Sequence, residues 1–340
     1  NICSFRHFNR LDLSNDLIYN NRSFYCIYVW TIKQPSKIIF GEKSANEFQF
    51  PEKCLVITSK GAKSRGWLDY SGLTNQTIFD DVEPNPSIET TEKIISKFQN
   101  LDFTHIIGIG GGSSMDVAKF CAFKMNKLKI MIPTTFGSGS EVTRISVLKV
   151  NNKKKSFHDD KLFSDISIID PYFIKNSSEE IIKNSAIDAC AQATEAYDSK
   201  LTNPYTKLLC EKAFDMLENS ILNQKYEQLP LGSLICGLGF GNSSTTLGHA
   251  LSYVYSNEGI SHGHALAFTT KVAHKFNNSI FYARFLKVVE KLQFTKISLK
   301  QNIHEASELI LLDKKHLDNN PQKVTGKDVE KLLNIINEGF

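Results

Sequence analysis

Short apolar runs rich in β-branched residues alternate with helical patterns along the first half of the chain. Runs of this kind, bounded by turn residues, predict buried strands, and they cover residues 54–59, 77–82, 105–110 and 129–134. Residues 87–100 favour a helix, because Ser87 is a good N-cap and Glu89 suits the positive end of the helix dipole. Strands alternating with helices are typical of a parallel, doubly wound sheet.

The pattern changes around Asp170 and Pro171, after which few strand candidates remain. The helical stretches cover 178–199, 203–220, 229–255 and 263–276, with several more up to residue 340. We therefore predict an α/β domain over 30–174 and an all-helical domain over 175–340. Residues 1–29 show no clear period, and we treat them as an extension of unknown role.

Composition narrows the class of protein. The chain has 340 residues, of which 41% are hydrophobic and 22% charged, and its net charge of +4 is mixed along the sequence. No nucleic-acid surface is expected from such a balance. The seven cysteines contain no CxxC pair, which favours reduced thiols. No apolar run approaches the ~20 residues that cross a bilayer, so we expect a soluble, cytoplasmic protein without a membrane partner.

Two glycine- and hydroxyl-rich loops follow predicted strands. In "IIGIGGGSSMDVAKF", Gly110, Gly111, Gly112 and Ser113 stand between a strand and a helix, where backbone N–H groups can hold a phosphate. A tight turn without a ligand is the alternative for this loop alone. The second loop, within residues 132–144, also follows a strand. Neighbouring parallel strands present such loops to one crevice, so together they indicate a dinucleotide site.

The second half of the chain holds a candidate metal site. Asp188 and Gln192 stand four residues apart on one predicted helix, so they share a face. His249 lies on another helix, and His262 follows a turn-like segment. One carboxylate and two imidazoles are suitable ligands for a divalent ion. His264 is two residues from His262 and points elsewhere on a helix, so it is the weaker candidate.

Seven collinear motifs, spread over roughly residues 30 to 340, make the chain resemble the iron-containing (group III metal-dependent) alcohol dehydrogenases. They read "PSKIIFGEKS", "VEPNPS", "IGGGSSMDVAK", "IPTTFGSGSEVT", "DISIIDP", "SAIDACAQATEAYDS" and "GHALSYVYSNEGISHGHA". The resemblance implies the fold shared with dehydroquinate synthase. It also implies an N-terminal domain that binds NAD(P)H, a helical domain that holds Fe²⁺ or Zn²⁺, and a cleft between them for an alcohol or aldehyde. A homo-oligomer, such as a dimer, is implied as well.

Carried over residue by residue, the family's metal ligands become Asp188, Gln192, His249 and His262. Gln192 departs from the family's histidine, and a neutral amide is a poorer ligand than imidazole. Gln192 then binds weakly or through water, or the metal site is compromised, and we expect a functioning site of three ligands plus one. Tyr253 stands where many relatives carry a histidine beside the substrate. Tyr253 and His264 are therefore our candidates for delivering a proton after hydride transfer.

The family resemblance also bears on the cofactor. After the strand "CLVIT" the family often has an acidic residue that holds the ribose of NAD, but Ser59 and Lys60 stand there in this chain. We therefore expect NADPH to be accepted, because no carboxylate repels its extra phosphate. The full set of cofactor-binding candidates is Ser59, Gly110, Gly111, Gly112, Ser113, Asp116, Thr134, Thr135 and Ser138.

The segment from "GHALSY" to "HGHA" is most similar to the branch that reduces phosphonoacetaldehyde to 2-hydroxyethylphosphonate in phosphonate biosynthesis. A phosphonate needs cationic partners, and Arg144 and Lys153–Lys155 are the candidates. Alternatively, these side chains are solvated or contact cofactor phosphates. Three other functions stay open: a general short-chain alcohol dehydrogenase, a lyase similar to dehydroquinate synthase, and a catalytically lapsed homologue.

Overall fold

A six-stranded parallel sheet organises the first half of the computed structural model, which describes residues 29–151, 153–175 and 177–339. In spatial order its strands are β1 (Lys37–Phe40), β8 (Ile166–Ile169), β5 (Leu128–Pro133), β4 (His105–Gly110), β2 (Cys54–Ile57) and β3 (Thr77–Phe79). All neighbouring pairs run parallel. The predicted parallel sheet is confirmed, and four of its strands coincide with the four predicted runs.

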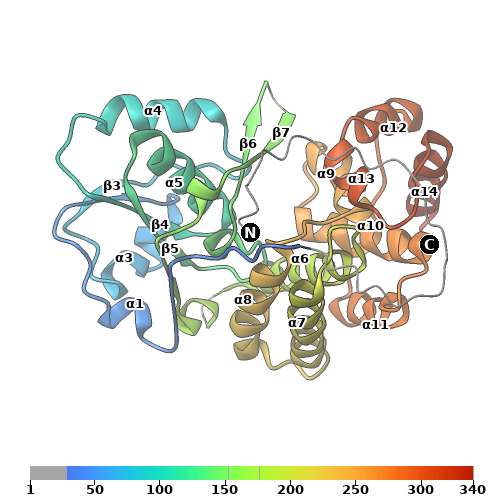
Figure 1. Ribbon diagram of the computed structural model, residues 1–340, viewed down its shortest axis with the longest axis horizontal. Helices are drawn as coiled ribbons and strands as arrows, with labels where there is room; N and C mark the ends of the chain where they lie inside the picture. Colours follow the sequence, from blue (N-terminus) through green and yellow to red (C-terminus); the bar gives the residue numbers. More distant parts are fainter. Residues whose placement is uncertain (1–28, 152, 176, 340) are drawn as a thin grey trace, which may run out of the picture. The chain divides into compact units, whose positions relative to one another are not determined.

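Both faces of this sheet are covered, which explains why its strands are continuously apolar. Along β2, Cys54 and Val56 belong to one buried cluster and Leu55 and Ile57 to another, because successive side chains point to opposite faces. Helices α4 (Ile88–Phe98) and α5 (Gly112–Met125) pack on the side of Leu55 and Ile57. Helices α1 (Ser44–Glu47), α2 (Gly61–Ser64) and α3 (Trp67–Tyr70) pack on the side of Cys54 and Val56 (Figure 1). Ser87 caps α4 as predicted, with its hydroxyl accepting from Thr90 N.

An antiparallel hairpin, β6 (Ile145–Val150) and β7 (Lys153–His158), lies in the chain between the sheet strands β5 and β8 and was not predicted. In Figure 1 it stands between α4 and α9. Several hydrogen bonds attach β6 to the α/β region; among them, Val147 N donates to Asp116 Oδ2 at 3.0 Å and Lys149 N donates to the Pro86 carbonyl at 2.7 Å. Lys153–Lys155 form the start of β7. Their side chains alternate between the two faces of this strand, so the three residues are not equally exposed to solvent.

Helices make up the rest of the described chain, and no strand follows β8 there. They are α6 (Glu179–Asp198), α7 (Pro204–Leu222), α8 (Leu229–Phe240), α9 (Leu247–Asn257), α10 (His262–Asn277), α11 (Tyr282–Leu292), α12 (Ile303–Leu311), α13 (Lys314–Asn319) and α14 (Gly326–Glu338). The single helix predicted over 229–255 is wrong. It breaks between α8 and α9, where Ser244 has φ 84° and Thr246 N bonds to a side chain of α6.

Two glycines let α9 lie directly against α10, and α10 directly against α6. A Cβ atom on Gly248 would come within 2.8 Å of Thr270 Cα, and one on Gly263 within 2.7 Å of Asn184 Cα. Real Cβ atoms do not approach backbone so closely, so each position excludes a side chain. Because Gly248 and Gly263 adjoin His249 and His262, this packing fixes the backbone positions from which the two imidazole side chains extend.

The described residues from Ile32 onward group into one compact unit, so the predicted division between residues 174 and 175 stays a proposal. The proposed extension 1–29 falls outside the described residues except for Val29. The five described cysteines are all free and buried, while Cys3 and Cys26 lie outside that part. No helix in the described ranges combines the length and apolar character that a membrane-spanning segment needs.

Replacing Gly263 with alanine tests the contact between α10 and α6. We expect Gly263→Ala to lower the free energy of unfolding by about 1–3 kcal/mol, because the added methyl group overpacks against backbone that has no room to move. Gly326→Ala is the control, since its Cβ would meet only the flexible end of Leu311 at 3.3 Å. Urea unfolding followed by circular dichroism measures both variants, and equal midpoints would contradict the tight packing.

Candidate metal and cofactor site

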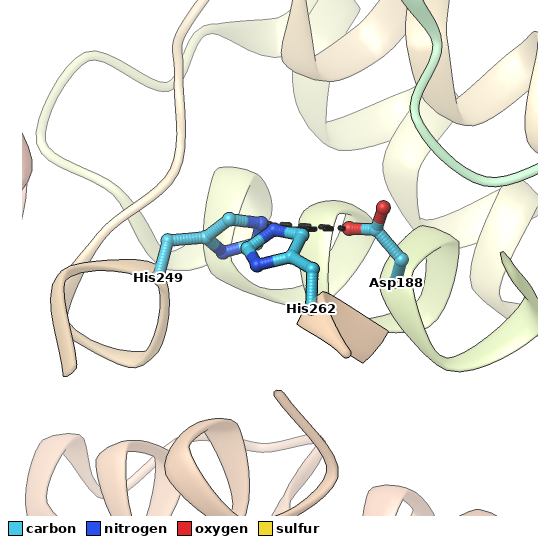
Figure 2. A group of neighbouring side chains, drawn as sticks. All are labelled: Asp188, His249 and His262. Carbon is cyan, nitrogen blue, oxygen red and sulfur yellow. Dashed lines mark ion pairs between the residues drawn. The ribbon is translucent and has the colours of Figure 1, made fainter. Parts of the chain in front are cut away.

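Three side chains from three helices converge in the second half of the chain. Asp188 comes from α6, His249 from α9 and His262 from the first turn of α10, and in Figure 2 both imidazole rings lie beside the carboxylate. The Nε2 atoms of His249 and His262 are 3.7 and 3.9 Å from Asp188 Oδ1. All three ligand atoms lie within 4.8 Å of one another, so one ion can reach them together.

These residues fit a first-row divalent metal. His249 Nε2 is buried and has no hydrogen-bond partner among the described residues, and 3.7 Å to Asp188 is too long for such a bond. A buried imidazole nitrogen without a partner is costly unless something binds it. Two atoms that each lie ~2.0–2.2 Å from one ion are separated by about this distance. The donor set of two imidazoles and one carboxylate suits Fe²⁺ or Zn²⁺.

Glu195, one turn beyond Gln192 on α6, fixes the orientation of His249. Its Oε2 atom accepts from His249 Nδ1 at 2.6 Å and from Thr246 N at 2.9 Å, and the side chain is buried. Burial lowers the pKa of His249, but the nearby carboxylates of Glu195 and Asp188 raise that pKa to about 9 overall. A carboxylate behind a ligating histidine sets the tautomer and the ring direction, leaving Nε2 for the metal.

Gln192 lies beside Asp188, but its amide nitrogen faces that side chain. Nε2 of Gln192 donates to Asp188 Oδ1 at 2.9 Å, and Cys236 Sγ lies 4.0 Å from Oε1. In this arrangement Gln192 positions the carboxylate of Asp188. Its predicted role as a ligand stays a proposal, since it requires the amide oxygen to turn toward the ion.

The first glycine loop forms an open helix N-terminus. Helix α5 begins at Gly112, and its N-cap, Gly111, provides no side-chain hydrogen bond. Gly110 has φ 151°, and a Cβ on it would lie 2.7 Å from Ser114 Oγ. On the neighbouring loop, Thr134 Oγ1 is buried without a partner among the described residues. Free N–H groups and a positive dipole end suit a cofactor pyrophosphate.

A cavity of about 340 Å³ joins the loops to the metal residues. Predicted residues that line it are Gly112, Ser113, Asp116, Thr135, Ser138, Asp188, Gln192, His249, Tyr253 and His262. Predicted residues outside its lining are Ser59, Gly110, Gly111, Thr134 and His264. The parallel strands and the helix packing therefore bring most of the predicted site to one cavity.

Asp116 and His264 have other partners. Asp116 accepts from Ser140 Oγ at 2.5 Å as well as from Val147 N, so its carboxylate joins the second loop to the hairpin. His264 Nε2 lies 2.6 Å from the Thr295 carbonyl, and its ring stacks on Phe294. The structure therefore does not bring His264 to the cavity. The reason is its position two residues after His262, which turns it to another face of α10.

Sequence reasoning missed a contribution from α13. His316 is buried and lines the cavity, and its Nδ1 lies 2.7 Å from Asp313 Oδ2. Its ring lies 6.3 Å from that of His249 and 5.7 Å from that of Tyr253, measured between centroids. Lys315 lines the same cavity. The only local signal is an aspartate three residues before a histidine, and an aspartate in that place also serves as an ordinary helix N-cap, as Asp313 does for α13.

Two family models match the chain. One, described as iron-containing alcohol dehydrogenase, matches residues 35–171. The other, the C-terminal part of the Fe-containing alcohol dehydrogenase family, matches residues 182–311. The first therefore ends next to η3 (Pro171–Ile174), and the second begins inside α6.

Individual relatives agree with these matches. The 4-hydroxybutyrate dehydrogenase of Clostridium kluyveri is 34% identical over 209 residues, which are 53% of this chain and 56% of that protein. The chain spans about half the length of the curated relatives it matches. Among solved structures, an iron-containing alcohol dehydrogenase from Thermotoga maritima has a TM-score of 0.83 at 24% identity, covering 91% of this chain and 100% of that one. A sulfoacetaldehyde reductase from Bifidobacterium kashiwanohense in complex with NAD⁺ has a TM-score of 0.82 at 22% identity, covering 92% and 100%.

Alanine replacements distinguish the roles of His249 on α9 and of His262 and His264 at the start of α10. We expect His249→Ala and His262→Ala each to weaken binding of Zn²⁺ by at least about 100-fold, because each removes a direct ligand where loss of a supporting residue already costs 10–100-fold. His264→Ala is the matched control and retains the metal, since its ring contacts Thr295 and Phe294. Titration calorimetry measures the affinities, and circular dichroism shows whether each variant is folded. Normal Zn²⁺ affinity in His249→Ala or His262→Ala would exclude this site.

Proposed function

The chain belongs to the iron-containing alcohol dehydrogenase family, and we propose that it is a metal-dependent NAD(P)H oxidoreductase that interconverts an alcohol and an aldehyde. One observation carries this proposal: the glycine-rich helix N-terminus and the Asp188, His249 and His262 cluster open into the same cavity. A cofactor and a substrate bound there are close enough to react. Reaction between two bound groups depends mainly on their positioning.

The residues of the site have distinct roles in this proposal. Asp188, His249 and His262 hold the metal, and the loop from Gly110 to Ser113 holds the cofactor pyrophosphate. A bound Fe²⁺ or Zn²⁺ supplies Lewis acidity toward the aldehyde oxygen, and a bound nicotinamide supplies the hydride. The protein contributes position and orientation.

Tyr253 is the proposed proton donor. It lines the cavity, its ring is nearly parallel to that of His262 at 6.3 Å, and it interacts with Ser156. A tyrosine hydroxyl is protonated at neutral pH, and burial raises the pKa of Tyr253 further, so its proton passes only to a group that is more basic than the phenolate. His264 is not retained in this role because it lies outside the cavity.

For the substrate we propose phosphonoacetaldehyde, reduced to 2-hydroxyethylphosphonate. The motif wording supports this choice, and so does the presence of Lys149, Lys154 and Lys315 around the cavity. The name of the relative from Clostridium kluyveri also refers to an alcohol that carries an anionic group. A general alcohol dehydrogenase for neutral short-chain substrates is the second candidate. The family match does not favour the lyase or the lapsed homologue. A homodimer remains part of the proposal.

Turnover with different aldehydes tests this function directly. Protein reconstituted anaerobically with Fe²⁺ or with Zn²⁺ is mixed with NADPH or NADH and either phosphonoacetaldehyde or propionaldehyde, and the loss of reduced nicotinamide absorbance is followed. We expect oxidation of NADPH with phosphonoacetaldehyde, because the cavity offers cations beside the metal residues. Turnover of propionaldehyde alone supports the general alcohol dehydrogenase. No oxidation with any pair of substrates refutes the oxidoreductase proposal.

Ser59, two residues after the end of β2, provides a test of cofactor choice. Ser59 is half-buried, and Lys60 beside it is exposed and paired with Asp81 at 2.9 Å. We expect Ser59→Asp to raise the KM for NADPH about tenfold, equivalent to ~1.4 kcal/mol, and to leave the KM for NADH equal or lower, since a carboxylate repels only the extra phosphate. Gln99→Glu adds the same charge at the exposed end of α4 as a control. An equal rise for both cofactors in Ser59→Asp would place Ser59 away from the ribose.

A further inference from the structure

Strand β7 sends alternate side chains into the cavity. Lys154 and Ser156 line the cavity, whereas Lys153 and Lys155 are exposed and lie outside its lining. Successive residues of a strand point to opposite faces, so the basic run of three residues contributes one ammonium group to the interior. That alternation also provides control positions on the same strand.

The ammonium group of Lys154 has no carboxylate partner among the described residues. The acidic residues of the cavity wall are Asp116 and Asp188. Asp116 is hydrogen-bonded to Ser140 and Val147, and it lies 3.4 Å from Lys119. Asp188 belongs to the metal cluster. Burial lowers the pKa of Lys154 to about 8, although the charge of Asp188 opposes that change. A partly buried charge without a partner is costly, so an anion that enters the cavity gains from it.

Lys154 lies next to the metal residues. Its Nζ atom is 5.9 Å from the centre of the Tyr253 ring, and that ring is 6.3 Å from the ring of His262. Burial lowers the pKa of His262, and the nearby charge of Lys154 lowers it further. One aromatic side chain therefore separates the ammonium group from the metal cluster, which leaves room for a short molecule to contact both.

Besides Lys149 of β6, which also lines the cavity, another cation reaches the cavity from α13. Lys315 lines the cavity, and its Nζ is hydrogen-bonded to His158 Nε2 at the end of β7. This contact links α13 to β7, the strand that also carries Lys154. Arg144, considered in the sequence as a further cation, is instead paired with Asp160 at 3.0 Å and does not line the cavity.

We propose that Lys154, assisted by Lys315, forms a subsite for the anionic group of a short substrate whose carbonyl or hydroxyl group faces Asp188, His249 and His262. The ligand class is an aldehyde or alcohol that carries a phosphonate, sulfonate or carboxylate one or two carbons from the reacting carbon. This inference rests on the proposed oxidoreductase function and names the residues that select its substrate. An ammonium group recognises all three anions as a point charge, and two lysines favour the doubly charged phosphonate.

Equilibrium binding to the Zn²⁺-loaded protein with NADP⁺ tests the subsite without relying on turnover. Titration calorimetry compares 2-hydroxyethylphosphonate, 2-hydroxyethanesulfonate and 3-hydroxypropionate with neutral 1-propanol. We expect Lys154→Met to weaken binding of 2-hydroxyethylphosphonate about 10- to 150-fold, the range for loss of one charged hydrogen bond. The loss for the phosphonate should exceed that for 1-propanol at least about tenfold. Lys154→Arg, which keeps the charge, should recover most of the affinity.

Lys155→Met is the matched control, because it removes the same charge from the outer face of the same strand. Equal phosphonate affinities in Lys154→Met and Lys155→Met would overturn the subsite, as would equal binding of 2-hydroxyethylphosphonate and 1-propanol by the unaltered protein. Tighter binding of the sulfonate or carboxylate than of the phosphonate supports the subsite and replaces phosphonoacetaldehyde as the proposed substrate. The unaltered protein could bind the anions through Lys154 and yet fail to oxidise NADPH with any of the aldehydes. In that case the proposed function fails and the subsite stands.

Discussion

The hydrogen bond between Glu195 and His249 is the interaction on which the geometry of the candidate metal site depends. It joins α6 to α9 inside the protein, where a carboxylate and an imidazole are stabilised only by well-placed partners. Thr246 N supplies the second hydrogen bond to the same oxygen. That donor is free because the chain breaks between α8 and α9. The helix break and the orientation of His249 are thus parts of one arrangement, and Gly248 makes it possible by leaving space beside Glu195.

A second buried pair supports the other wall of the cavity. Lys119 is fully buried, and its ammonium group donates to the carbonyls of Ser140 and Thr143 at 2.7 and 3.3 Å. Asp116, one turn earlier on α5, accepts from the same loop and from β6. Helix α5 therefore presents its N-terminus toward the proposed cofactor site and also anchors the hairpin that carries Lys154. Because one helix supports both features, the cofactor loops and the anion subsite keep a fixed relation to each other.

The sequence predicted those parts of the site that arise from local patterns. The parallel strands, the glycine loop before α5 and the four-residue spacing of Asp188 and Gln192 are all local, so the structure contains them at the expected positions. The break between α8 and α9 was missed because the apolar pattern runs through it and the polar partner of Thr246 lies on another helix. His316 was missed for a similar reason, since only tertiary packing brings α13 to the cavity. The run Lys153–Lys155 offered three equivalent charges, and only strand alternation against the cavity distinguishes Lys154.

The departure at Gln192 is consistent with a site built on three protein ligands. A histidine at this position would present a nitrogen lone pair to the ion, whereas the amide of Gln192 donates a hydrogen bond to Asp188 Oδ1. In this orientation the amide holds the carboxylate in place and would leave a position around the proposed metal open. Catalytic zinc sites commonly use three protein ligands and leave a position open. In the proposed function, an open metal position beside the proposed subsite of Lys154 would give a small anionic aldehyde two points of attachment, and two points define its orientation better than one.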